Sequence, residues 1–425
     1  MSETIEHKCP CCGGSVVFDA TSQKVKCPYC DSEFDVADMM KNEGDLTEVT
    51  DDLATDGGEE WSEQELYGLS EYQCQSCGGD IYSDSTTSAT LCPYCGNAVV
   101  LKGRLSGVLK PDKVIPFKMT KEQALAGLEE HCGGKRFVPK KFIQNNRLEE
   151  IKGLYVPFWV YDAELDASVQ YEGVDVRRWT SGNTEYTERK YYDVVRAGDI
   201  AFDHVPADGS SKMPDDLMES IEPFDYNQAQ DFTTGYLSGY VADKYDVDQE
   251  QVRPRVRKRM QEGAADAFRT TVHYDEIYVK SIESEAKQSN VNYVLYPVWL
   301  MNTEWEDKKF IFAMNGQTGK MVGNLPTDII KLGGVAISIF VALTAIISLV
   351  YYFLSEEFDF TVVIGAAILA GIVSAAVFAY YKSQHRSVEF QHGAANYYRQ
   401  DSMNIKVKKD QFVRKTVTSR RISND

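Results

Sequence analysis

The stretch that decides the fold reads Cys74-Gln-Ser-Cys77-Gly78 and, after fourteen further residues, Cys92-Pro-Tyr-Cys95-Gly96. The same pattern occurs 65 residues earlier without a gap, as Cys9-Pro-Cys-Cys12-Gly13 and Cys27-Pro-Tyr-Cys30-Asp31. Each set reads Cys-x2-Cys-x14-Cys-x2-Cys, which lies next to the spacing typical of four-cysteine zinc sites. The sequence therefore predicts two zinc ribbons near the N-terminus.

Zinc chemistry explains why these residue types are needed at this spacing. Zn²⁺ takes four thiolates in a tetrahedron at about 2.3 Å each, so each cysteine pair supplies half of the shell. Gly78 and Gly96 follow the second cysteine of their pairs, where glycine allows the positive φ of a tight turn. Because protein thiolates fill every position, both sites are expected to be structural rather than catalytic. The expected ligands of the two zinc ions are Cys9, Cys12, Cys27 and Cys30 in one ribbon and Cys74, Cys77, Cys92 and Cys95 in the other.

The cysteine pairs also admit a redox interpretation. Cys-Pro-Tyr-Cys is a redox-active sequence of glutaredoxin-like proteins, but that site requires a thioredoxin-like βαβ frame. Here each copy follows another cysteine pair and short β-like segments such as Ser15 to Phe18, which favours structural zinc. Of the two remaining cysteines, Cys11 is a spacer within its turn, and Cys132 is expected to be a buried or half-buried thiol at a helix end.

Charge is distributed unevenly along the 425 residues, whose formal net charge is −19. The segment from Lys382 to Asp425 contains ten basic and four acidic residues, so the remainder is strongly acidic. An acidic body repels phosphate backbones, which disfavours general nucleic-acid binding. The polar N-terminus gives no sign of a secretory signal peptide, so we expect the thiols in a reducing compartment, where such pairs hold metal.

The composition predicts an α+β multidomain protein. The segment between the ribbons is rich in acidic residues and glycine and poor in apolar residues, which is typical of a flexible linker. The region after the second ribbon is expected to be a mixed, β-rich domain with a helical insertion. The expected domains are a rubredoxin-like zinc ribbon at 1–40, an acidic flexible linker at 41–71, zinc ribbon 2 at 72–102, a central α+β domain at 103–327, transmembrane helices at 332–354 and 360–381, and a basic cytoplasmic tail at 382–425.

Local signals place the elements of the central domain. Thr120 to Gln123 has the pattern of a capping box that opens an amphipathic helix. Aromatic and β-branched runs from Leu154 to Arg196 and from Val272 to Val322 predict strands. The segment between them, Met213 to Thr271, is expected to be mostly helical.

We find no catalytic constellation in the chain, and we expect no enzyme activity. Asn315 to Lys320 looks like a phosphate loop but lacks the first glycine and the final Ser or Thr of the Walker A pattern. The basic run from Arg253 to Arg259 is the best nucleic-acid or lipid-headgroup candidate. Acidic residues flank this run, so a solvated helix face with internal ion pairs is the favoured interpretation.

Two uncharged apolar segments, Leu332 to Leu354 and Phe360 to Tyr381, follow the central domain. At 1.5 Å per residue, each is long enough to cross a hydrocarbon core of about 30 Å. Basic residues flank the pair, so the positive-inside rule predicts a two-helix, multi-pass protein of the cell membrane with both termini in the cytoplasm. A stripe of small residues predicts close packing against the first helix or within a homo-oligomer; it consists of Ala367, Gly371, Ala375 and Ala379.

The order of these parts resembles a family of Gram-positive bacterial membrane proteins often called TFIIB-type zinc ribbon-containing proteins. Some members carry the label of a primosomal helicase, through the cysteine pairs alone. The resemblance implies cytosolic partners of SPFH-type, TPM-domain or phage-shock-like kinds and a role in an envelope stress response. The motifs that carry it are the two ribbons, Gly153 to Trp159, Ser211 to Met213, Ser220 to Phe224, Pro297 to Trp299, Met314 to Lys320, and the helix hairpin.

The sequence thus favours a membrane-anchored scaffold that recruits cytosolic proteins to the inner leaflet. One alternative is a membrane-tethered nucleic-acid-binding protein, because zinc ribbons serve in transcription and replication. A thiol redox function is a second alternative. The three hypotheses differ in whether the cysteines hold metal and in what the chain binds.

The cysteine spacing predicts two zinc ions per purified chain. Replacing Cys27 and Cys30 by serine should remove one ion, and the same change at Cys92 and Cys95 should remove the other, because a thiolate pair is half of each shell. Inductively coupled plasma mass spectrometry of the three proteins measures this. A wild-type chain without stoichiometric metal, or with these cysteines oxidised in cells, would contradict it.

Overall fold

The protein is described here from a computed structural model. Three short antiparallel strands in the segment predicted to be the first ribbon are described at the level of the backbone, namely β1 (Val17–Asp19), β2 (Lys24–Lys26) and β3 (Glu33–Phe34). The predicted ligands Cys9, Cys12, Cys27 and Cys30, and also Cys11, lie outside the described residues. The structure describes residues 17–19, 24–26, 33–34, 53–84, 91–139, 142, 151–306, 308–355, 360–388 and 393–421.

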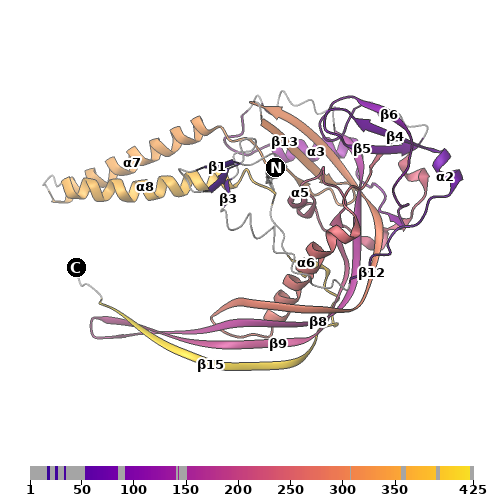
Figure 1. Ribbon diagram of the computed structural model, residues 1–425. Coiled ribbons are helices and arrows are strands. Elements are labelled where there is room, and N and C mark those ends of the chain that lie inside the picture. The colour runs from indigo at the N-terminus through magenta and orange to yellow at the C-terminus, as the bar shows by residue number, and fades with distance from the viewer. Residues whose placement is uncertain are drawn as a thin grey trace, which may run out of the picture.

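A long, curved β-sheet forms the centre of the molecule (Figure 1). Strands β8 (Lys152–Ser181) and β12 (Glu276–Trp305) have 30 residues each and pair antiparallel over nearly their whole length. Strand β9 (Thr184–Asp208) returns along the other edge of β8 through a two-residue turn, in which Gly182 has φ +58°. Such turns need positive φ, which glycine adopts readily. The predicted strands thus merge into a few very long ones.

The remaining elements extend this sheet or cover it. Strand β12 continues into β13 (Lys308–Asn315), which pairs with β14 (Met321–Val322). The other short elements are α2 (Glu63–Tyr67), β4 (Leu69–Cys74), β5 (Asp80–Asp84), β6 (Val99–Arg104), β7 (Lys113–Val114), α3 (Lys121–Cys132), α5 (Asp215–Ser220), η2 (Tyr226–Gln228), β10 (Gln230–Asp231), η3 (Thr234–Leu237), β11 (Val241–Asp243), α6 (Gln249–Arg269) and η4 (Ala395–Tyr397).

Helix α3 begins where the sequence predicts. The Thr120 hydroxyl accepts from the Gln123 amide, and the Gln123 side chain accepts from the Thr120 amide, which completes the capping box. The apolar face of α3 packs on Trp299 and Phe312 of the sheet in one buried cluster. Cys132 ends this helix and is 3% exposed, so the expectation of a buried thiol at a helix end is confirmed.

The segment from Met213 to Thr271 is less helical than the sequence predicts. Helix α6 forms, but α5 has only six residues, and η2, β10, η3 and β11 occupy the stretch between them. Glycines at 235 and 239 and a proline at 223 interrupt this stretch, and both residue types break helices. Helix α6 packs in the curve of the sheet and buries Val252, Val256, Met260, Ala264 and Phe268.

The basic run from Arg253 to Arg259 serves the interior of the protein. Arg259 is 2% exposed, and its two terminal nitrogens donate to the Glu222 carboxylate at 3.1 and 2.7 Å. Arg255 donates to Asp208, also buried, at 2.5 Å. The helix face is therefore only partly solvated, and the acids that pair with these arginines come from β9 and the α5 region rather than from residues that flank the run. Arg259 is therefore not accessible to nucleic acid, and the half-buried Arg255 is already paired with a carboxylate.

The predicted flexible linker is attached to the body from residue 53 onward. Leu53 is 4% exposed and belongs to the main core. The Ala54 amide donates to Ser289 Oγ at 2.7 Å, and the Gly58 amide donates to Asp112 Oδ2 at 2.8 Å. The composition argument missed these contacts because a single buried leucine and a few backbone hydrogen bonds are enough to hold a short polar segment.

The basic tail is not a free tail. Strand β15 (Asn404–Arg421) pairs antiparallel with β9 along the edge of the sheet. Ion pairs of both polarities join it to the body: Lys406 Nζ lies 2.7 Å from Asp199 Oδ1, and Asp410 of β15 pairs with Arg196 of β9 at 2.5 Å. The charge asymmetry of the sequence thus brings the end of the chain back to the sheet.

Helices α7 (Ile329–Ser355) and α8 (Phe360–Ser383) form an antiparallel hairpin that projects from the body (Figure 1). Both are long and apolar enough to cross a membrane, and most of their surface is exposed. The stripe of α8 that is buried in the hairpin is Ala366, Ala370 and Ser374. The predicted stripe is therefore displaced by one residue, because the rotation of α8 is set by packing with α7 and not by the smallest side chains alone.

The base of the hairpin is fixed to the body. His385 follows α8, is 2% exposed, and places its ring nitrogens 2.6 Å from Thr327 Oγ1 and 2.7 Å from the Arg136 carbonyl oxygen. The Tyr381 ring packs edge-on against Phe137 at 5.1 Å. Burial lowers the pKa of His385, which favours the neutral ring that accepts at one nitrogen and donates at the other.

One carboxyl group beside the buried arginines gives the fold a pH dependence. Burial, with the neighbouring Glu222 and Asp215 carboxylates, raises the pKa of Glu219 to about 7 despite Arg259 and Arg255. An unfolded glutamate has a pKa near 4.5. Between these two values the folded protein keeps a proton that the unfolded chain has lost, so stability falls as pH rises through this window.

We predict that Glu219→Gln stabilises the protein at pH 8, by on the order of 2 kcal/mol, and has little effect at pH 5, where Glu219 is already neutral. Thermal melts of the detergent-solubilised protein at both pH values measure this. Glu250→Gln, an exposed change on α6, is the matched control. Equal effects of Glu219→Gln at the two pH values would contradict the prediction.

Candidate metal centre

The cysteines of the second ribbon converge at the end of a small antiparallel sheet. Strand β4 pairs with both β5 and β6, so the two cysteine pairs meet at one end of these strands. The Sγ atoms of Cys74 and Cys95 lie 3.4 Å apart, and those of Cys77 and Cys92 lie 3.6 Å apart. All four sulfur atoms lie within 4.8 Å of one another.

The two cysteine turns have the same backbone geometry. The Gly78 amide donates to the Cys74 carbonyl at 2.9 Å, and the Gly96 amide donates to the Cys92 carbonyl at 3.0 Å. Gly78 and Gly96 have φ values of +71° and +74°, which confirms the positive φ expected of them. A β-carbon is disfavoured in this conformation, which explains why glycine follows each Cys-x-x-Cys.

The thiols have unequal electrostatic surroundings. Burial raises the pKa of Cys77 and Cys92. Burial also opposes ionisation of Cys95, but hydrogen bonds from the backbone and side chain of Asn97 lower its pKa to about 7. A bound metal cation would lower the pKa of all four thiols, because a thiol that coordinates a metal is deprotonated.

The donor set fits a tetrahedral metal ion. Bonds of 2.3 Å in a tetrahedron place sulfurs about 3.8 Å apart, close to the two short separations here. Four cysteines and no oxygen ligand suit a soft or borderline cation. The described cluster therefore could bind one metal ion, with every coordination position filled by the protein.

The second ribbon is part of the central sheet and not an isolated module. Strand β5 pairs antiparallel with β11, and β11 pairs in parallel with the start of β8. This gives the continuous strand order β6–β4–β5–β11–β8. Backbone hydrogen bonds thus connect the strands that carry the cysteine cluster to the central strand β8.

Side chains of the two longest strands also hold the second cysteine turn. Lys152 on β8 donates to the Leu91 carbonyl at 3.0 Å. Asn302 on β12 donates to the Pro93 carbonyl at 2.6 Å. These contacts join residues 61 and 209 positions apart in the sequence, so the turn is positioned by the fold as well as by its own hairpin.

An ion-paired carboxylate stabilises the same junction. Glu71 on β4 is 1% exposed and lies 2.8 Å from Lys102 Nζ and 3.2 Å from Lys244 Nζ. Burial opposes its ionisation, but these two lysines lower its pKa. Lys102 belongs to the ribbon and Lys244 follows β11, so Glu71 joins the ribbon to the sheet.

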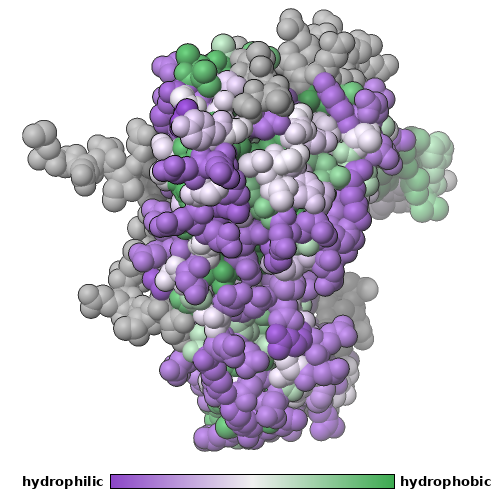
Figure 2. Space-filling view, turned by 90° about the vertical axis from the view of Figure 1, so that its right-hand side faces the viewer, coloured by the Kyte–Doolittle hydropathy of each residue, from purple (hydrophilic) through white to green (hydrophobic). Residues whose placement is uncertain are grey.

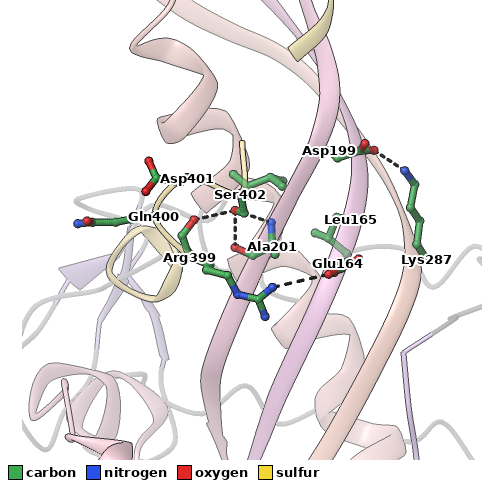
Figure 3. Close-up of a pocket in the computed structure, with 10 residues that line it drawn as sticks. Glu164, Leu165, Asp199, Ala201, Lys287, Arg399, Gln400, Asp401 and Ser402 are labelled. Carbon is green, nitrogen blue, oxygen red and sulfur yellow. Dashed lines mark hydrogen bonds and ion pairs between the residues drawn. The ribbon is translucent and has the colours of Figure 1, made fainter. Parts of the chain in front are cut away.

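A second concave region lies on the sheet, away from the cysteines (Figure 3). It has a volume of about 320 Å³ and lies between β8, β9, β12 and the turn before β15. Four of its charged groups form ion pairs with each other: Lys287 with Asp199, and Arg399 with Glu164 at 3.6 Å. Because these groups satisfy one another, the region gives no chemical reason to expect a ligand.

The sequence identified the four cysteines of this centre but missed the residues that support it. These supporting residues lie outside the stretch from Cys74 to Cys95, so the cysteine spacing does not identify them; they are Glu71, Lys152 and Asn302. Nothing in the sequence Cys92-Pro-Tyr-Cys95 indicates that the Pro93 carbonyl accepts a hydrogen bond from a distant side chain. Lys152 and Asn302 reach the cluster because β5, β11, β8 and β12 pair in one sheet, whereas Glu71 lies on β4 itself.

Comparison with known proteins gives one relative. The chain is 33% identical over 323 residues to a Bacillus subtilis (strain 168) protein described as uncharacterized protein YdjG. The similarity covers 76% of this chain and 90% of that protein. No family model matches, and no solved structure matches.

We predict that Cys92→Ser loosens β11 as well as the ribbon. A structural metal contributes on the order of 10 kcal/mol to the folding of an isolated ribbon, and β5 is hydrogen-bonded to β11. Hydrogen exchange should therefore become faster at residues 69–104 and 241–243. Cys132→Ser, a buried cysteine outside the cluster, is the control. Unchanged exchange at 241–243 would show that the ribbon is independent of the sheet.

Proposed function

The chain belongs to the family of YdjG, and we propose that it is a membrane-anchored zinc-ribbon scaffold that recruits cytosolic proteins to the inner leaflet. In this proposal the two cysteine sets hold one zinc ion each as structural ions. Cys74, Cys77, Cys92 and Cys95 would hold one, and Cys9, Cys12, Cys27 and Cys30 the other. The α7–α8 hairpin crosses the bilayer, and the chain is not an enzyme.

The observation that carries the proposal is the junction of the ribbon with the sheet. A closed four-cysteine shell offers no position to a substrate, so its effect on the protein is to fix a shape. Here that shape continues through β5 and β11 into β8. A rigid surface held by metal suits recognition of a protein partner better than chemistry.

The attachment of both hairpin ends supports a single orientation of the body. The chain enters α7 from residues packed on the body and returns through His385 to strand β15. Both flanks of the hairpin therefore lie beside the same body. Lys331, Lys382 and Arg386 lie at these flanks, which favours the cytoplasm for the body and both termini under the positive-inside rule.

The partner-binding surface is expected on the side away from the hairpin. Figure 2 views the body from the right of Figure 1, opposite the direction in which the hairpin projects, and mainly hydrophilic side chains cover that face. A polar face suits reversible association with soluble proteins. Partners of SPFH-type, TPM-domain or phage-shock-like kinds, implied by the resemblance of the sequence, are the proposed occupants.

The proposal is tested with full-length protein captured from solubilised membranes. The double variant Cys74→Ser with Cys77→Ser should stay in membranes after a carbonate wash but lose a partner that the wild type retains, because the hairpin is intact and the ribbon is not. Quantitative mass spectrometry of the captured material measures this, with Cys132→Ser as control. Extraction of the wild type by carbonate, or full partner retention by the double variant, would overturn the proposal.

A further inference from the structure

The far end of the long strands forms a narrow three-stranded arm with a distinctive surface. We call residues 175–181 of β8, 184–191 of β9 and 414–421 of β15 the arm tip. In it, β9 pairs with β8 on one side and with β15 on the other. Figure 1 shows this end of the sheet extending beyond α6, so none of the helices in the described residues covers the arm tip.

Aromatic side chains occur on both faces of the arm tip. Trp179 and Tyr186 are opposite each other in the register and stack with ring centroids 5.4 Å apart and planes inclined by 8°. The Arg177 guanidinium lies 5.8 Å from the centroid of the Trp179 ring. On the other face the Arg414 guanidinium lies 4.4 Å from the centroid of the Tyr191 ring. Aromatic and basic groups are thus interleaved.

The arm tip is basic, whereas the body is acidic. Three of its cations are paired: Arg189 lies 2.7 Å from Glu276, and Lys415 and Lys190 lie 2.9 and 3.6 Å from Glu188. Other cations have exposed side chains that extend into solvent around the end of the hairpin. These exposed cations are Arg177, Arg178, Arg420 and Arg421.

The arm and the membrane hairpin extend from the body on the same side (Figure 1). The hairpin is held at its base by the contacts of His385 and Tyr381, so its direction relative to the sheet is defined. Charged residues lie on both faces of the arm, so it cannot enter hydrocarbon. In Figure 1 the arm tip reaches past the base of the hairpin and lies alongside it, so the tip meets the headgroups when the hairpin is tilted in the bilayer.

We propose that the arm tip binds the anionic headgroups of the membrane into which the hairpin inserts. This inference rests on the proposed membrane anchoring and adds a second, electrostatic contact with the same surface. Arginines near an anionic leaflet are attracted to it, and Trp and Tyr favour the interface between water and hydrocarbon. The two contacts together hold the body in one orientation instead of letting it rotate about the hairpin.

A lipid surface fits the arm tip better than a nucleic acid does. Trp179 and Tyr186 already stack on each other, so their facing surfaces are not open to bases, and base stacking is the usual role of aromatics in single-strand binding. The acidic body would repel a long phosphate backbone, whereas lipid headgroups need to contact only the basic arm tip. Binding to lipid headgroups requires only a short basic surface such as the arm tip.

The test uses the full chain in lipid nanodiscs of phosphatidylcholine alone or mixed with phosphatidylglycerol. Hydrogen exchange at residues 175–191 and 414–421 should be slower in the anionic discs, and added salt should remove the difference. The variant Arg177→Glu, Arg178→Glu, Arg420→Glu and Arg421→Glu should lose it, since each arginine is expected to change the bound-to-free ratio of the arm about fivefold.

A control with the same charge change separates this contact from net charge. It carries Lys118→Glu, Lys258→Glu, Arg269→Glu and Lys309→Glu, four exposed sites outside the arm tip, and should keep the lipid-dependent protection. Equal exchange of the wild type in both kinds of disc would overturn the inference, as would protection of the arm tip by an added DNA or RNA oligonucleotide in phosphatidylcholine discs. Failure of the chain to enter any disc would instead overturn the proposed membrane anchoring.

Discussion

Backbone hydrogen bonding along β8 is the constraint on which the rest of the structure depends. A buried strand must pair its amides and carbonyls on both edges, and β8 has 30 residues to satisfy. Strand β12 pairs with one edge, and β9 and β11 share the other. Each additional part of the protein attaches to these strands: the ribbon through β11, the C-terminal strand through β9, and α6 through the face that the curve of the sheet encloses.

Electrostatic pairing decides which parts of a strongly acidic chain come together. The interior accepts Arg255 and Arg259 because Asp208 and Glu222 lie beside them, and a buried charge needs such a partner. At the sheet edge, the basic strand β15 lies on a part of the body that carries Asp199. The positive charge of the sequence is thus divided between ion pairs in the core and an exposed arm.

The cysteine cluster and the hairpin are attached to the same body at different places. The cysteine cluster lies at one end of the strand order and fixes β4, β5 and β6. The hairpin base contacts the body through Thr327 and His385. Because both are joined to continuous strands, the cysteine cluster and the hairpin base are held in a fixed relation to each other, which a ribbon on a flexible tether would not achieve.

The sequence by itself determined the elements whose signals are local. Cysteine spacing predicted the cluster of Cys74, Cys77, Cys92 and Cys95, and a capping box predicted the start of α3. The length of the two uncharged apolar segments predicted the two apolar helices. Only the tertiary structure decided that the ribbon joins the sheet, that residue 53 begins an attached segment, and that the basic tail becomes β15. These depend on strand pairing between residues far apart in the chain, and pairing of that kind leaves no periodic or compositional mark in either segment.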